Sequence, residues 1–188
     1  MKYPVPSALA LAPALRAARL AFVSMALMGT ASAPAHAETP AQWQAALQQT
    51  RVTLAQAIDA AEAAAPGRAV EAQLEIDKGT PHFEVELVTP QGSHVEVHVD
   101  AASAAALRQQ DKGPAATKDR QRLEASKITL QQAIDAALRH TPGAALEAEF
   151  GNDWGRSVIA VDVLTAAGQR QKIKLDPTHG ALMGAKPD

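Results

Sequence analysis

Apolar and polar positions follow one pattern twice along the chain. Residues 52–107 align with residues 128–183 at a constant offset of 76 residues and without a gap. Each copy opens with a threonine followed three residues later by glutamine, Thr53 and Gln56 in the first copy, which predicts a capped helix start. The apolar residues then recur at helical spacing until a Pro-Gly pair ends the helix. The register indicates duplication of one small module.

After the helix the apolar period changes from 3.6 to 2, which predicts strands with one buried face. Residues 70–77 form the first strand, and residues 83–87 and 95–99 form the arms of a hairpin that turns at 89–92. A three-residue loop predicts a register in which apolar side chains face one another. The predicted pairs are Leu87 with Val95, Val85 with Val97 and Phe83 with Val99, and in the second copy Val161 with Ile173 and Ile159 with Leu175.

These elements predict an α+β protein of two tandem modules, each with one helix packed on a three- or four-stranded antiparallel sheet. After Asp100 the first copy has neither Pro nor Gly, so 101–107 is expected to be a short strand or a short helix. Residues 118–126 are expected to form a polar helix before the second module. The predicted divisions are a signal peptide (1–37), an N-terminal helical lead (38–51), module 1 (52–107), a linker around Lys112-Gly113-Pro114 (108–127) and module 2 (128–188).

The first 37 residues have the pattern of an export signal. A basic start precedes an apolar core at 20–28 and small residues that end at Ala35-His36-Ala37, so cleavage is expected after Ala37. We therefore expect a periplasmic or secreted protein without a membrane span in the mature chain. The chain has no cysteine, which excludes disulfides. Without the signal, 15 basic and 20 acidic residues give a net charge of −5, and this balance argues against a nucleic-acid partner.

The second copy resembles the PepSY domain, a module of thermolysin-like protease propeptides and of many exported bacterial proteins. The matching features are ITLQQAIDAAL at 128–138, Pro142-Gly143, Val161-Asp162-Val163, Gly168 and the D-P-x-x-G sequence at 176–180. The first copy departs from the family where the glycine after Asp100 is missing. The resemblance implies an exported, non-catalytic module that in propeptides inhibits or assists a protease. No peptidase sequence follows the two copies, so we do not expect a propeptide role within the same chain.

The outward face of the first hairpin carries the candidate chemistry. The alternation that points Val95, Val97 and Val99 inward points histidines and glutamates outward. Imidazole and carboxylate at this spacing are ligands for Zn²⁺ or Cu²⁺. The candidate metal ligands are His82, Glu84, His94, Glu96 and His98. A solvated acidic face is the simpler interpretation, and the second copy has no such set, with Val158, Ala160, Asp162, Arg170, Lys172 and Lys174 at the corresponding positions.

The sequence contains no HExxH, GxSxG, Walker or dinucleotide motif, so we expect neither an enzyme nor a cofactor. We expect a binding or regulatory protein that modulates or inhibits a protease through protein–protein contact. The expected partner is a periplasmic protease or an envelope sensor. The alternative is a periplasmic metal or small-ligand sensor or buffer that uses the His/Glu face of module 1. Trp43 and Trp154 fall outside the regular pattern, and each either packs on the sheet or marks a contact surface. Packing is the interpretation that we favour for both.

Overall fold

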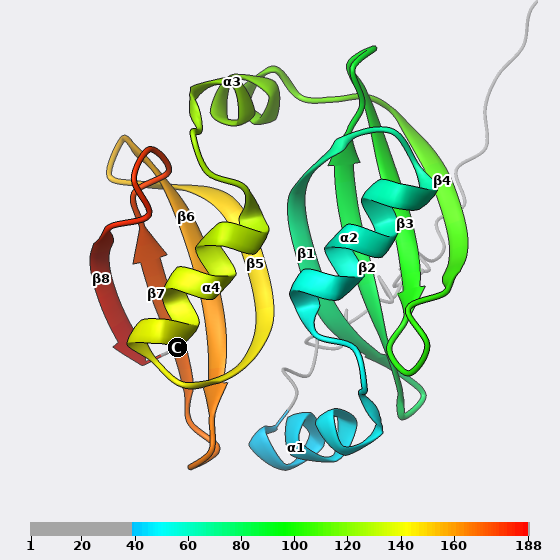
Figure 1. Ribbon diagram of the computed structural model, residues 1–188, viewed down its shortest axis with the longest axis vertical. Helices are drawn as coiled ribbons and strands as arrows, with labels where there is room; N and C mark the ends of the chain where they lie inside the picture. The colour runs from blue at the N-terminus through cyan, green and yellow to red at the C-terminus, as the bar shows by residue number, and fades with distance from the viewer. Residues whose placement is uncertain (1–38, 188) are drawn as a thin grey trace, which may run out of the picture. The chain divides into compact units, whose positions relative to one another are not determined.

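The computed structural model describes residues 39–187, so the expected signal peptide (1–37) lies outside the described residues. Within this range one antiparallel sheet has the strand order β4-β3-β2-β1-β5-β6-β7-β8 (Figure 1). The elements are α1 (Pro40–Gln49), α2 (Leu54–Ala64), β1 (Arg68–Asp77), β2 (Thr80–Val88), β3 (Ser93–Asp100), β4 (Ala106–Pro114), α3 (Thr117–Ala125), α4 (Leu130–His140), β5 (Gly143–Asp153), β6 (Arg156–Thr165), β7 (Arg170–Leu175) and β8 (Leu182–Pro187). The predicted α+β class and the two helix-on-sheet modules are confirmed.

The helix starts follow the predicted capping pattern. In α2 the Thr53 side chain accepts a hydrogen bond from the Gln56 backbone, and the Gln56 side chain accepts one from the Thr53 backbone. Thr129 and Gln132 repeat this arrangement in α4, and Thr39 and Gln42 repeat it in α1. Each cap satisfies two amides that would otherwise lack partners. The helix expected within residues 38–51 is therefore α1.

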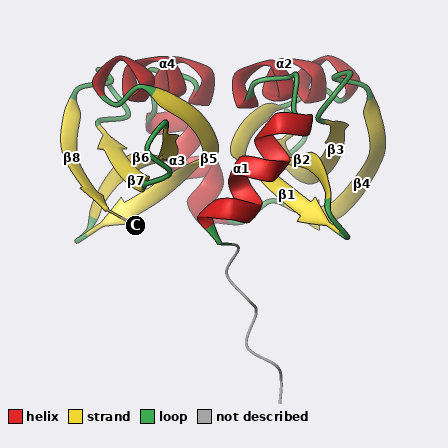
Figure 2. Ribbon diagram, turned by 90° about the horizontal axis from the view of Figure 1, so that it is seen from below, coloured by secondary structure: helices red, strands yellow, loops and turns green. Residues whose placement is uncertain are grey.

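The core lies between the sheet and the helices α2 and α4, which Figure 2 shows on the same side of their strands. Helix α2 buries Leu54, Ala57, Ile58 and Ala61, and α4 buries Leu130, Ala133, Ile134 and Ala137. Opposite them the strands present the predicted apolar pairs, with Val85 facing Val97 and Val161 facing Ile173. Both hairpin registers are thus confirmed. The face of the sheet away from these helices, called the far face below, carries the polar positions of each strand.

The linker prediction is wrong for residues 108–114, because these residues belong to β4, which pairs with β3. The turn before β4 forms without the family's glycine. Asp100 Oδ1 accepts hydrogen bonds from the Ser103 backbone and side chain at 2.7 Å, and Ala104 adopts a φ of 63°. Gly180, at the equivalent place in module 2, has a φ of 67°. Gly113 and Pro114 fit within a strand because β4 is at the sheet edge, where one side of the backbone needs no ladder partner.

The connection between the modules is consequently short. Two residues follow β4 before helix α3, which corresponds to the polar helix expected at 118–126. Strands β1 and β5 pair directly through Glu71 with Glu149, Ala72 with Ala148 and Gln73 with Glu147. This pairing joins the two modules in one sheet, an arrangement that the sequence did not predict.

The two tryptophans differ in environment. Trp43 is buried as expected, on α1. The packing prediction is wrong for Trp154, whose side chain is 99% exposed. Trp154 and Gly155 form the two-residue turn between β5 and β6 with φ values of 51° and 85°. Such a turn requires positive φ at both residues and directs the first side chain away from the sheet.

Candidate functional site

The candidate ligands lie on the far face of module 1, on β2 and β3. The predicted register places Glu84 opposite His98 and Glu86 opposite Glu96, and the structure has this register. The side chains are more buried than the solvated face that we favoured from the sequence. Glu96 is buried, and the other four candidates are partly buried. Opposed carboxylates in such an environment repel one another unless cations lie near them.

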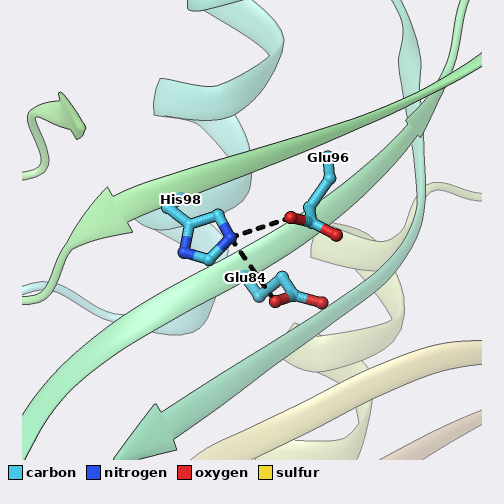
Figure 3. A group of neighbouring side chains, drawn as sticks. All are labelled: Glu84, Glu96 and His98. Atoms are coloured by element: carbon cyan, nitrogen blue, oxygen red, sulfur yellow. Dashed lines mark hydrogen bonds and ion pairs between the residues drawn. The ribbon is translucent and has the colours of Figure 1, made fainter. Parts of the chain in front are cut away.

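Three of the five candidates form a compact group, drawn in Figure 3. His98 Nε2 lies 2.9 Å from Glu96 Oε1 and 3.6 Å from Glu84 Oε2. One ligand atom from each residue lies within 4.8 Å of the other two. The strand register sets this geometry, because Glu84 and His98 are cross-strand partners while Glu96 and His98 are two residues apart on β3.

The remaining two candidates occupy neighbouring positions. The His82 ring stacks on the His98 ring with a centroid distance of 5.2 Å, and His82 Nε2 lies 3.5 Å from Glu75 Oε2. His94 is outside the group. Its Nε2 lies 2.8 Å from Glu86 Oε2, close enough for an ion pair but not aligned as a hydrogen bond. The structure thus brings four of the five predicted residues together and separates His94 from them.

Lys112 is the main contributor that the sequence analysis missed. Its Nζ donates a hydrogen bond of 2.5 Å to Glu96 Oε2. We had assigned Lys112 to a linker, whereas it lies on β4 beside β3. Residues 108–112 are all polar and have no apolar alternation, and Gly113-Pro114 suggested a break in the chain, so the sequence carried no clear signal for this strand.

The environment shifts the two glutamate carboxyls in opposite directions. Burial raises the pKa of Glu84, and the nearby charges of Glu75 and Glu96 raise this pKa further. The hydrogen bond from Lys112 lowers the pKa of Glu96, and the contact with His98 adds to this lowering. Glu96 is therefore held as a carboxylate, while Glu84 retains a proton more readily than an isolated glutamate.

At the corresponding positions of module 2, arginine and lysine side chains neutralise the carboxylates. Arg170 Nη2 donates to Asp162 Oδ2 at 2.5 Å and to Glu147 Oε2 at 3.0 Å. Lys172 Nζ lies 3.6 Å from the same Asp162 oxygen. The second copy lacks the His/Glu set of the first, and the structure shows how the contacts of the two faces differ. Histidines contact glutamates in module 1, whereas arginine and lysine contact aspartates and glutamates in module 2.

Carboxylates also gather where the modules join. Glu71 on β1 lies opposite Glu149 on β5. Burial raises the pKa of Glu71 to about 7, and the charges of Glu86, Glu149 and Glu147 contribute to this rise. Burial and the neighbouring Asp162 likewise raise the pKa of Glu147. The far face therefore holds an acidic centre between the histidines of module 1 and the basic residues of module 2.

Two helix-on-sheet repeats that share one sheet define a tandem α+β repeat protein. The sequence profile described as "Peptidase propeptide and YPEB domain", or PepSY, matches residues 51–110 and 127–185. The chain belongs to the PepSY family. The match to 51–110 includes the copy that lacks the family's glycine after Asp100.

Two solved structures are similar to this chain. A lipoprotein from Clostridium difficile is 20% identical with a TM-score of 0.45, and the match covers 74% of this chain and 95% of that one. The YpmB protein from Bacillus subtilis is 16% identical with a TM-score of 0.33, and the match covers 69% and 96%. No curated protein matches the chain significantly. Among residues 39–187, no helix has the length and apolar character needed to cross a membrane.

Proposed function

We propose that the chain is an exported, non-catalytic binding protein that modulates a protease by docking to it through the two edge strands of its sheet. Membership of the family provides the link to proteases, because that family includes peptidase propeptides. The two PepSY repeats and α1 contain nearly all of residues 39–187, and the target that we propose for them is a separate protease.

The observation that carries this proposal is a repeated feature of the edge strands β4 and β8. Leu107 on β4 and Met183 on β8 are equivalent residues of the two copies. Each is skipped in the pairing of its strand with the neighbouring strand, so each occupies a bulge. Their exposed fractions are 61% and 40%. Bulges redirect side chains at sheet edges, and here both modules use one to present a large apolar residue.

An edge strand offers unpaired backbone N–H and C=O groups along one side. An extended segment of a partner can add to such an edge as a further strand, with backbone hydrogen bonds supplying affinity and side-chain contacts supplying specificity. Leu107 and Met183 would then contact apolar side chains of the added segment. Leu182 adds further exposed apolar surface to β8. Because the sheet has two such edges, one molecule of this protein offers two docking positions.

The test compares two double variants of the chain from residue 38. Leu107→Lys with Met183→Lys places charge at both bulges. The control, Gln109→Lys with Ala185→Lys, adds the same charge at exposed positions of the same two strands. Each protein is immobilised and incubated with the exported proteins of the source cells. The retained proteins are identified by mass spectrometry, and the effect of each soluble variant on casein hydrolysis by the same fraction is measured.

We expect the unmodified protein and the control to retain a protease and to change the rate of casein hydrolysis. We expect the bulge variant to lose at least tenfold in retention and to leave hydrolysis unchanged. Equal retention by both variants would contradict docking through the bulges. Failure of the unmodified protein to retain a protease or to change hydrolysis would contradict the proposed function itself.

A further inference from the structure

We propose that Glu84, Glu96 and His98 form a binding site for a divalent transition-metal ion of the zinc type. This site lies on the far face of the sheet and is separate from the edge strands of the proposed docking function. Success or failure of one proposal therefore does not decide the other. The alternative is that protons on the histidines neutralise this face without any metal ion, and the experiment below distinguishes the two.

The geometry of the donor atoms fits one ion. Zinc binds imidazole nitrogen and carboxylate oxygen at about 2.0–2.2 Å, so donors around one tetrahedral zinc lie about 3.4 Å apart. The observed separations are 2.9 Å from His98 Nε2 to Glu96 Oε1 and 3.6 Å from His98 Nε2 to Glu84 Oε2. Small rotations of the glutamate side chains would equalise these distances. Three protein ligands would leave a fourth position for water or for an additional ligand.

Neighbouring residues hold the donors in place. Lys112 bonds to Glu96 Oε2 and leaves Oε1 directed at His98. The stacked His82 ring, at an interplanar angle of 8°, restricts rotation of the His98 ring. Hydrogen bonds to a ligating carboxylate and restraint of a ligating imidazole are typical supports of metal sites. Metal binding at His98 Nε2 requires a neutral imidazole whose hydrogen lies on Nδ1 and a deprotonated Glu84 carboxylate.

The charge balance of the face provides an independent argument. The carboxyls of Glu75, Glu84, Glu86 and Glu96 gather beside three histidines and two permanent cations, Lys112 and Arg108, and Arg108 lies opposite His98 on β4. At the equivalent positions in module 2, Arg170, Lys172 and Lys174 replace His94, Glu96 and His98, and these permanent cations contact Asp162, Glu147 and Asp153. The same sheet position is thus neutralised in module 2 by side chains alone. Module 1 has four carboxyls beside two permanent cations on this face, so a bound metal cation would improve its charge balance. Its imidazoles are donors that Zn²⁺ binds much better than Mg²⁺ or Ca²⁺ does.

The experiment titrates the chain from residue 38 with Zn²⁺ by calorimetry at pH 7.5. Mg²⁺ and Ca²⁺ are titrated for comparison. His98→Lys is the main variant, because it introduces the residue found at the equivalent position 174 and places a permanent cation beside Glu84 and Glu96. Glu84→Gln removes a second ligand with little change of volume. His179→Ala is the matched control, because His179 is the exposed histidine of a turn in module 2.

We expect one saturable zinc site and no comparable heat from Mg²⁺ or Ca²⁺. A hundredfold excess of zinc over its Kd should raise Tm by about 5–10 °C. His98→Lys and Glu84→Gln should weaken binding at least tenfold, while His179→Ala should bind like the unmodified protein.

Two results would overturn the proposal. One is the absence of saturable zinc binding, which would show that the side chains of this face need no metal ion. The other is equal zinc affinity in His98→Lys and the unmodified protein, which would place the ion elsewhere. Circular dichroism of each variant shows whether it is folded, and Glu84→Gln decides the outcome if His98→Lys is not.

Discussion

The pairing of β1 with β5 leads us to predict how the free energy of unfolding depends on pH. Glu71 lies opposite Glu149, and burial together with Glu86, Glu149 and Glu147 raises its pKa from 4.5 to about 7. The folded protein therefore binds the Glu71 proton more tightly than the unfolded chain does. The sign follows from linkage: the contribution of Glu71 to the free energy of unfolding falls as the pH rises from about 4.5 to about 7, and stays low above that pH.

The magnitude can be bounded. One pKa unit corresponds to about 1.4 kcal/mol, so the rise to about 7 corresponds to at most about 3.4 kcal/mol. Glu71 is only partly buried, and water screens the repulsion that it experiences. We therefore expect Glu71→Gln to increase the free energy of unfolding by about 1–2 kcal/mol at pH 8. At pH 4 the variant and the unmodified protein should be nearly equal, because Glu71 is protonated in both the folded and the unfolded state.

Urea denaturation followed by circular dichroism at pH 4, 6 and 8 measures this difference. Glu124→Gln is the control, because Glu124 is an exposed carboxylate on α3 outside the sheet. Substitution at such a surface position changes stability by less than about 0.5 kcal/mol. A gain for Glu71→Gln that is the same at pH 4 and pH 8 would refute the electrostatic explanation. A loss of stability at pH 8 would show that the Glu71 carboxylate stabilises the junction, contrary to our reasoning.

Two further predictions concern a pair of equivalent glycines and the exposed tryptophan. A methyl group at Gly143 would lie 2.3 Å from Leu164 O, whereas one at Gly67 would lie 3.1 Å from Leu87 Cβ. Gly143→Ala should therefore lower the free energy of unfolding by about 2–4 kcal/mol, and Gly67→Ala should lower it by clearly less. Equal losses of stability in urea denaturation would contradict this prediction. Trp154→Asn should leave the free energy of unfolding unchanged or raise it by up to about 1 kcal/mol, because asparagine favours the positive φ that Trp154 adopts. A large fall in Tm would mean that Trp154 packs against the protein.

Local pattern was sufficient to predict the interior of each module. The alternation in 83–87 and 95–99 determined which side chains are buried, and a shift of one residue would have exposed all of them, so the register was well specified. The capped starts of α2 and α4 were equally clear, because threonine and glutamine at this spacing satisfy particular amides. The same register brought Glu84, Glu96 and His98 together, which is why the candidate site could be anticipated.

Features that depend on contacts between residues distant in sequence could not be predicted from local pattern. Lys112 joins the site only because β4 forms, and β4 forms although Ala104 occupies a position that favours glycine. Asp100 compensates through hydrogen bonds to the turn, an interaction that composition does not reveal. Trp154 was expected to pack because aromatic residues are usually buried, but the two-residue turn determined its position instead.

The pairing of β1 with β5 also explains why docking should occur at β4 and β8. Separate modules would each expose two edges, and joining them covers β1 and β5. This junction is short and places Glu71 opposite Glu149, so other contacts must support it. Gln131 on α4 supplies two, donating to Asp59 Oδ1 at 3.0 Å and to Glu62 Oε2 at 3.1 Å on α2. The two edges that remain are those that carry Leu107 and Met183, and the added strand of a partner would extend the sheet there without disturbing the junction.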